Sequence, residues 1–275
     1  MSQSAKLLHL FIFLTFSIFY SNSQKVIIGA PSIGMGSISR LSTTKNYFQN
    51  NPAILGFSNE LYATNISIQQ SYISTEVQTK TIGLSIPNNH GAWGFSVSKD
   101  GFSDFNTTSI SLAYGISLSK QTAIGIQANT QYLNTNRGRS TLIVLPEVSI
   151  IGYLTDQFGY STILYNPTRA SYEQKSLYRS DSEIKLGLFY TNHTTLTLAF
   201  EIRKTSQNPS IFAFGGQYKM NPHFNLNWGF QTNKTLSSGI DYTYQRIQYS
   251  ISIPLHLELG LSPTISILYD FYKKG

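Results

Sequence analysis

Most of the chain alternates apolar and polar residues with a period of two. At this period, every second side chain points to the same face of a β-strand. In residues 107–118, for example, Ile110, Leu112 and Tyr114 alternate with Ser and Ala. The same alternation predicts strands at residues 61–72, 76–87, 92–99, 107–118, 122–132, 141–154, 158–166, 182–190, 194–204, 210–219, 224–231, 239–245, 247–254 and 261–272. The pattern therefore predicts an all-β chain of about fourteen strands.

The connections between these segments are alternately short and long. The short ones are residues 88–91, 119–121, 155–157, 191–193, 220–223 and 245–246; the long ones are residues 100–106, 133–140, 167–181, 205–209, 232–238 and 255–260. Outer-membrane barrels have short periplasmic turns, longer extracellular loops and usually an even number of strands, each about 9–11 residues long. The sequence thus predicts a transmembrane antiparallel up-and-down β-barrel with both termini in the periplasm.

The composition fits a surface that faces lipid. Charged residues make up 12% of the chain, against about 25% in soluble domains, and the chain has 18 Tyr and 17 Phe. The polar strand faces carry Ser, Thr, Asn, Gln and Gly with isolated charges, which are Glu147, Glu183, Lys185, Glu201, Arg203 and Asp241. A soluble sandwich exposes a more charged face, and closing the barrel removes strand edges that lipid cannot satisfy. We expect a weakly charged lumen, with a secreted β-sandwich as the alternative.

The N-terminus predicts export. Lys6 precedes an apolar run from Leu7 to Tyr20, and small residues follow at 21–23. This is the pattern of a cleaved signal peptide, here residues 1–23, and the run is shorter than the about 20 residues of a membrane-spanning helix. An uncleaved anchor is the alternative. The remaining chain divides into an N-terminal segment, residues 24–57, and the barrel, residues 58–275, which we expect in the outer membrane of a Gram-negative bacterium.

No recognisable catalytic or metal-binding pattern occurs in the sequence. Cys is absent, the His residues lack partners at metal-ligand spacing, and neither HExxH nor GxSxG is present. We therefore expect no enzyme, cofactor or metal, although a lipid hydrolase assembled across strands stays open as a third function hypothesis.

The net charge of +7 is dispersed over loops, whereas a nucleic-acid binder concentrates it in one stripe. We expect no nucleic-acid partner. Basic loops at the outer surface can bind lipopolysaccharide phosphates. The candidate residues are Arg137, Arg139, Arg169, Lys175 and Arg179. The alternative is that loops are simply where charges are solvated.

The N-terminal segment is the only part of the mature chain without strand periodicity. A fourteen-stranded barrel has a lumen too wide for its own Ser and Thr side chains to fill, so residues 24–57 are predicted to form a luminal plug. Gly34 and Gly36 would let the backbone approach the wall, and Pro52 would fix a turn that Asn51 can cap. A periplasmic tail at the barrel mouth is the alternative.

Two phrases in this segment carry a family resemblance. The phrase at 29–36 is GAPSIGMG and the one at 51–55 is NPAIL. Followed by such strands, they resemble the start of FadL-like outer-membrane barrels, and more closely of their PorV and PorQ relatives from Bacteroidetes; the YNPTR phrase at 165–169 is also similar. Pro31, Ile54 and the modest loops depart from the family pattern. The resemblance implies an N-terminal hatch, for which the candidate residues are Gly29, Gly34, Met35, Gly36, Asn51, Pro52 and Ala53.

The resemblance also implies two functions. The first is binding or passive transport of a small hydrophobic compound past the hatch. The alternative is a non-transporting accessory of type IX secretion, with secretion-system proteins as partners. In both cases we expect a monomer in contact with outer-membrane lipid and lipopolysaccharide.

Overall fold

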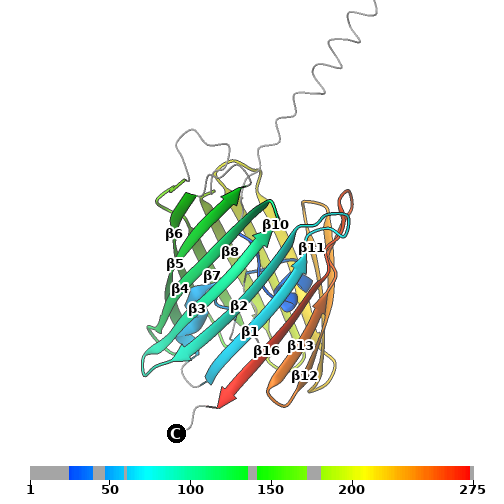
Figure 1. The fold of residues 1–275 in the computed structure, drawn as a ribbon. Coiled ribbons are helices and arrows are strands. Elements are labelled where there is room, and N and C mark those ends of the chain that lie inside the picture. The colour runs from blue at the N-terminus through cyan, green and yellow to red at the C-terminus, as the bar shows by residue number, and fades with distance from the viewer. Residues whose placement is uncertain (1–24, 40–46, 59–60, 136–140, 172–180, 273–275) are drawn as a thin grey trace, which may run out of the picture.

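The protein is a closed antiparallel β-barrel of fourteen strands (Figure 1). The computed structural model describes residues 25–39, 47–58, 61–135, 141–171 and 181–272; the expected signal peptide lies outside them. Strands β1 to β13 pair in sequence order, β13 pairs with β16, and β16 pairs with β1 to complete the ring. The all-β, up-and-down barrel predicted from the alternating pattern is confirmed.

The fourteen wall strands have the bounds β1 Leu61–Gln70, β2 Gln78–Pro87, β3 Gly91–Gly101, β4 Phe105–Ser117, β5 Thr122–Thr135, β6 Thr141–Tyr153, β7 Phe158–Tyr165, β8 Glu183–Thr191, β9 Leu196–Thr205, β10 Ile211–Lys219, β11 Phe224–Gln231, β12 Thr235–Tyr244, β13 Ile247–Ser252 and β16 Thr264–Tyr272. Two short strands, β14 Leu255–His256 and β15 Gly260–Leu261, form a hairpin. This hairpin prolongs β13 and β16 past Pro254 and Pro263, which lack the amide hydrogen that a ladder needs. The long connection expected at 255–260 is therefore mostly a paired hairpin, because pairing resumes beyond both prolines.

The two mouths of the barrel differ in their connections. We call the end with connections 71–77 and 166–182 the loop mouth, and the end with connections 88–90, 118–121 and 245–246 the turn mouth. The difference is smaller than the sequence predicted, since only residues 102–104 and 232–234 separate β3 from β4 and β11 from β12. These strands continue past their apolar positions, where backbone pairing alone extends the hairpins.

Side-chain direction alternates through the wall. In β2, Ile82, Leu84 and Ile86 point outward while the residues between them are buried. Outward aromatic pairs near the turn mouth include Trp93 with Tyr114, whose ring centroids lie 4.5 Å apart. Similar pairs are Phe158–Tyr190 and Phe224–Tyr242. Such aromatic residues form the girdle of an outer-membrane barrel at the level of the lipid headgroups.

The N-terminal segment lies inside the barrel. We call its described parts, residues 25–39 and 47–58, the luminal segment. It contains helix α2 (Ala30–Gly34), which contacts β11, β12, β13 and β16, and the 3-10 helix η1 (Pro52–Phe57), which contacts β3 to β6 (Figure 1). Among the described residues, no helix is long and apolar enough to span a membrane.

The luminal segment runs along the lumen from one mouth toward the other. Lys25 lines a cavity with Tyr72 and His256 at the loop mouth, whereas Phe57 packs against Tyr153 at the end of β6 near the turn mouth. Lys25 and Tyr272, the first and last described residues, therefore lie toward opposite mouths. From the sequence we expected both termini on one side; which mouth faces the periplasm stays a prediction.

The closed ladder gives a first prediction. Ile265 pairs with Ile68 of β1 and with Ile251 of β13, so an Ile265→Pro substitution removes an amide hydrogen at the seam of the ring. We expect this variant to lose the fast-migrating folded band in unheated detergent gels. Ile265→Ala keeps the amide and should retain the band, and equal migration of both variants would contradict the closed ring.

Candidate functional site

The luminal segment contacts the wall where the wall has glycines. On β10 and β11, Gly215 and Gly229 lie beside the Met35–Gly36 peptide. A Cβ atom on Gly215 would lie 2.1 Å from the Met35 carbonyl oxygen, and one on Gly229 would lie 2.1 Å from the Gly36 nitrogen. Real Cβ atoms essentially never come so close to backbone, so only glycine lets the segment lie against these strands.

A second pair of wall glycines contacts η1. A Cβ on Gly125 of β5 would lie 2.3 Å from the Ala53 nitrogen, and one on Gly115 of β4 would lie 2.7 Å from the Leu55 Cβ. Between these two pairs of wall glycines, Phe48 packs on Gly94 and Gln49 packs on Gly83. Six wall glycines, on β2, β3, β4, β5, β10 and β11, thus match the contour of the luminal segment; their residues are Gly83, Gly94, Gly115, Gly125, Gly215 and Gly229.

Local hydrogen bonds fix the shape of the segment. Asn51 caps η1, because its side chain accepts a hydrogen bond from the Ala53 nitrogen at 3.1 Å, and Pro52 occupies the first turn, where its missing amide costs nothing. The same Ala53 nitrogen donates to the Ser149 hydroxyl of β6 at 2.8 Å. The Asn50 side chain bonds both backbone groups of Ile28 at 2.8 Å. Asn50 therefore ties the two parts of the luminal segment together.

The wall opposite β2 and β3 carries a charged stripe, which we define as Glu147, Glu183, Lys185, Glu201 and Arg203. All five side chains are buried and come from β6, β8 and β9. Within the stripe, Arg203 Nε lies 2.7 Å from Glu201 Oε1, and Lys185 Nζ lies 3.4 Å from Glu183 Oε2. Buried charges of this kind persist only when they are paired.

The luminal segment completes the charged stripe. Lys25 forms an ion pair with Glu147, which would otherwise be the unpaired acid of the stripe. Arg203 donates to the carbonyl oxygens of Gly36 and Ser37, and Glu201 accepts from the nitrogen and hydroxyl of Ser39 at 2.9 and 3.2 Å. With Lys25 in place, the cluster has three cations and three carboxylates, so its formal charge balances only when the segment is bound.

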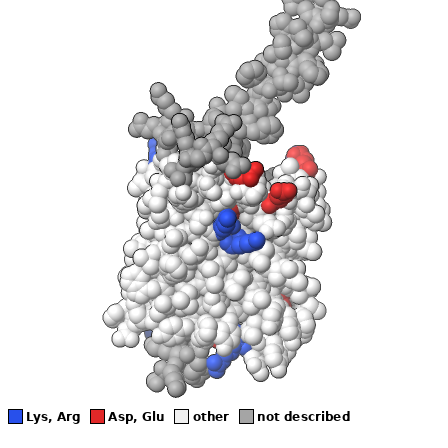
Figure 2. All heavy atoms as spheres, in the orientation of Figure 1, with Lys and Arg blue, Asp and Glu red and all other residues white. Residues whose placement is uncertain are grey.

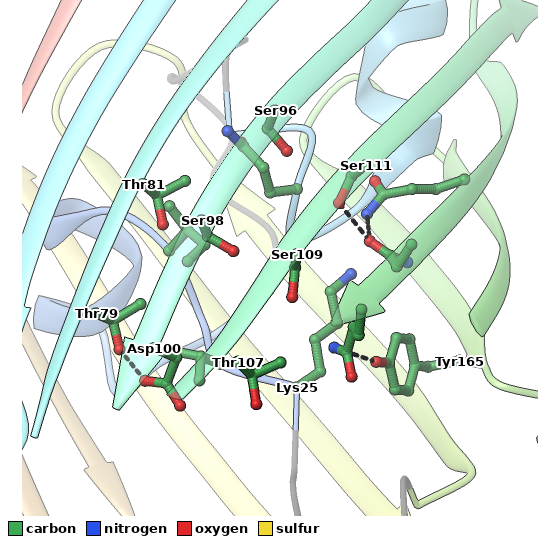
Figure 3. A pocket seen from close by; sticks show the side chains of 16 residues that line it. Lys25, Thr79, Thr81, Ser96, Ser98, Asp100, Thr107, Ser109, Ser111 and Tyr165 are labelled. Atoms are coloured by element: carbon green, nitrogen blue, oxygen red, sulfur yellow. Dashed lines mark hydrogen bonds between the residues drawn. The ribbon is translucent and has the colours of Figure 1, made fainter. Parts of the chain in front are cut away.

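Cavities formed by described residues lie beside the luminal segment at three places. One of about 300 Å3 lies at the loop mouth beside Lys25, Arg203 and His256. A second, of about 70 Å3, lies behind β2 to β5 and is lined by Ser and Thr rows with Lys25 and Tyr165 beside them (Figure 3). The third, of about 240 Å3, lies at the turn mouth between Thr195, Pro222 and Asp270. All three are lined largely by polar side chains, and none runs from mouth to mouth.

The candidate hatch residues lie together in the lumen. Gly29 begins α2 with φ 90° and packs on the Tyr47 ring; Gly34, Met35 and Gly36 lie against β10 to β13; Asn51, Pro52 and Ala53 lie against β4 to β6. Of the basic-loop candidates, Arg169 is exposed in the turn after β7. Arg137, Arg139, Lys175 and Arg179 lie outside the described residues, and lipopolysaccharide binding by this loop set stays a prediction.

Two features of the site were not predicted from the sequence. The strand pattern predicts the wall glycines only as small residues of the polar strand faces, although their inward positions on six strands are a signal of close backbone contact. The charges of the stripe were expected as isolated lumen residues. They do face the lumen, but the barrel gathers five of them on three strands, β6, β8 and β9.

The histidines do not form a catalytic arrangement with serine in the described parts of the chain. His193 and His223 bond the backbone carbonyls of Asp156 and Thr243, and His256 accepts from backbone amides. Within the same residues, no group of three or more His, Cys, Asp or Glu side chains is arranged to hold a metal ion. No observation favours the lipid-hydrolase hypothesis.

Comparison with solved structures identifies hydrocarbon channels of the same fold. The chain resembles the CymD monoaromatic hydrocarbon channel with a TM-score of 0.62 and 11% identity, over 91% of this chain and 99% of that one. It resembles the toluene transporter TbuX of Ralstonia pickettii with a TM-score of 0.60 and 10% identity, over 89% and 98%. The toluene transporter TodX of Pseudomonas putida matches with a TM-score of 0.60 and 10% identity, over 90% and 98%.

These likenesses show a barrel fold shared with the hydrocarbon channels, and the FadL-like resemblance of the N-terminal phrases is consistent with it. No family model matches the chain, and no curated protein matches it. The finer resemblance to PorV and PorQ stays a prediction.

The contacts between the wall glycines and the luminal segment give a second prediction. Gly125→Ala and Gly215→Ala each place a methyl group against backbone of the luminal segment, at 2.3 Å and 2.1 Å, so we expect the segment to leave the wall and become accessible to protease added to folded protein in detergent. Gly187→Ala is the matched control, because the nearest atoms to its Cβ belong to the wall, with the Ser161 hydroxyl closest at 2.6 Å. Equal protection of the segment in all three variants would show that the wall glycines are not needed for the segment to bind the wall.

A third prediction compares a buried and an exposed ion pair. Lys25 and Glu147 are 10% and 0% exposed, whereas Lys234 and Glu258 are 60% and 62% exposed. Removing one partner of a buried pair costs about 3–5 kcal/mol, so Glu147→Ala should release the start of the luminal segment and speed its proteolysis markedly. Glu258→Ala should leave the rate almost unchanged. Similar rates in the two variants would contradict an anchoring role for Lys25.

Proposed function

We propose that the protein is an outer-membrane channel for small hydrophobic compounds, closed at rest by its luminal segment. The observation that carries the proposal is the fit between that segment and the wall, in which six glycines and a charged stripe receive it. The hydrocarbon channels of similar fold support the proposed class of compound. At their level of identity they support it by analogy of fold alone.

The contacts of the luminal segment suit a displaceable plug. Met35, Phe48 and Leu55 are completely buried and hold it in place. Many of its other contacts are hydrogen bonds to wall side chains such as Ser149, Glu201 and Ser266, and water entering the lumen can replace these. Displacement therefore costs the burial of the apolar side chains of the segment, at about 25 cal/mol per Å2 of apolar surface, together with the Lys25–Glu147 ion pair.

The polar lining of the cavities constrains the route. The cavities at the two mouths have volumes of about 300 and 240 Å3, and α2, η1 and their neighbours occupy the lumen between them. In the closed state, none of these cavities gives a hydrophobic compound an apolar path between the mouths. Passage therefore requires movement of the luminal segment, which makes that segment the gate.

The alternative function is that of a secretion accessory. It would be favoured by an apolar patch on the outer loops above a sealed lumen. Ile73, Leu257 and Leu259 are exposed apolar residues at the loop mouth, but much of the longest connection, residues 172–180, lies outside the described residues, so this alternative stays a prediction.

The fourth prediction tests the gate. Deleting residues 25–58 should leave an open lumen and raise single-channel conductance in planar bilayers well above that of the full chain. The full chain should conduct little, because its plug remains seated. Unchanged conductance in a correctly folded deletion variant would remove the gating role of the segment.

The deletion needs a folding control. Heat-modifiable migration shows whether the barrel still forms without its plug. Where it does not, the Gly125→Ala and Gly215→Ala variants provide the same test with the whole chain present, and Gly187→Ala provides the matched background. A raised conductance in the first two variants but not in the third is the expected result.

A further inference from the structure

Two lysines lie directly opposite each other on the lipid-facing side of the wall. Lys80 of β2 pairs with Lys99 of β3 in the strand register, and both side chains are exposed. Figure 2 shows blue side chains gathered in the upper middle of this face, with red side chains between them and the upper mouth. Their row continues with Ile68 on β1 and Thr108 on β4.

This arrangement is unfavourable without a partner. Like charges directly opposite each other on neighbouring strands destabilise a sheet. The ion pairs between described residues use Lys25, Lys185, Arg203 and Lys234, and neither Lys80 nor Lys99 is among them. Asp100, the next residue along β3, points to the other face and accepts a hydrogen bond from Thr79. An external anion is therefore the natural partner of the pair.

The depth of the pair identifies the kind of anion. Trp93, at the turn-mouth girdle, lies six residues before Lys99 on β3. Six residues span about 20 Å along a strand, and a tilt of about 40° reduces this to about 15 Å along the membrane normal. An extended lysine side chain adds about 6 Å, which brings the ammonium group close to the far edge of an apolar band about 25 Å tall. At that level the anions are lipid phosphates.

We infer that Lys80 and Lys99 form a binding site for the phosphate of a lipopolysaccharide lipid A headgroup. With the loop mouth facing outward, the pair lies at the headgroup level of the outer leaflet, where lipid A carries the phosphates. Beneath the lysines, Ile82 and Val97 continue the apolar wall along which acyl chains can pack. Thr108 and, beyond it on β5, Tyr132 add hydroxyl groups along the same row.

The site is distinct from the basic loops considered above, because it lies on the strands themselves. It depends on the barrel crossing the outer membrane with its loop mouth outward. It does not depend on the luminal segment, so its failure would leave the channel proposal untouched.

Native mass spectrometry of the purified full chain in detergent tests the site. The probes are diphosphorylated lipid A, dephosphorylated lipid A and phosphatidylglycerol, each titrated separately. We expect the protein to retain one diphosphorylated lipid A, and the Lys80→Gln/Lys99→Gln variant to bind it on the order of ten-fold more weakly. Dephosphorylated lipid A should bind both forms equally weakly.

Two further variants separate site from net charge. Lys120→Gln/Lys219→Gln removes the same charge from exposed residues at the turn mouth, and it should bind lipid A as the unaltered chain does. Lys80→Arg/Lys99→Arg keeps the charge and should retain binding, which also controls for misfolding of the Gln variant. Undiminished binding by the Lys80→Gln/Lys99→Gln variant, an equal loss in the turn-mouth variant, or binding of phosphatidylglycerol as tight as that of lipid A would each overturn the proposal.

Discussion

The width of the barrel is the constraint on which the rest of the structure depends. Strands in lipid must pair on both sides, so the sheet closes on itself, and fourteen strands enclose more space than their own inward side chains can fill. The inward positions are mostly Ser, Thr, Asn, Gln and Gly, whose side chains are short. The lumen must therefore hold water or another part of the chain, and here it holds the luminal segment.

Small residues on both partners make this filling possible. Wall glycines such as Gly125 and Gly215 remove the Cβ atoms that would collide with the segment backbone, and Gly36 does the same from the opposite side with Phe214 and Phe230. The charges of the wall and the segment are also complementary, because Lys25 supplies the cation that pairs with Glu147. The wall and the segment are thus complementary in shape and in charge, which explains how a segment with only two short helices keeps a defined path through the lumen.

The fold could be predicted from the sequence because the two-residue strand period and exposure to lipid constrain the residue type at every position of the wall. The alternation of Ile82, Leu84 and Ile86 with small polar residues specifies both pairing and facing. The end of each strand was less readable: Gly101 and Thr235 continue the ladders beyond the last apolar position, and Pro254 interrupts a strand without ending it. Backbone pairing decides these positions, and it leaves little trace in side-chain pattern.

The site could be predicted from the sequence only in part. The N-terminal segment stood out because it lacks period two, and the need to fill the lumen placed it there. Its partners did not stand out, since Gly83 and Gly229 resemble any other small residue until the three-dimensional contact is known. Glu147, Glu183 and Arg203 are far apart in the sequence, so only the closed register of β6 to β9 brings them beside Lys25.

The most direct test of the account is a reversible lock on the luminal segment. A Cβ on Gly34 would lie 3.4 Å from the Ser252 Cβ, close to the spacing of about 3.5–4.5 Å found in disulfides, and the chain has no cysteine of its own. Uptake of a small hydrophobic compound into vesicles containing the Gly34→Cys/Ser252→Cys variant would be measured before and after reduction. The account predicts that oxidised protein blocks uptake and that reduction restores it. Equal uptake in both states would contradict the claim that the luminal segment is the gate.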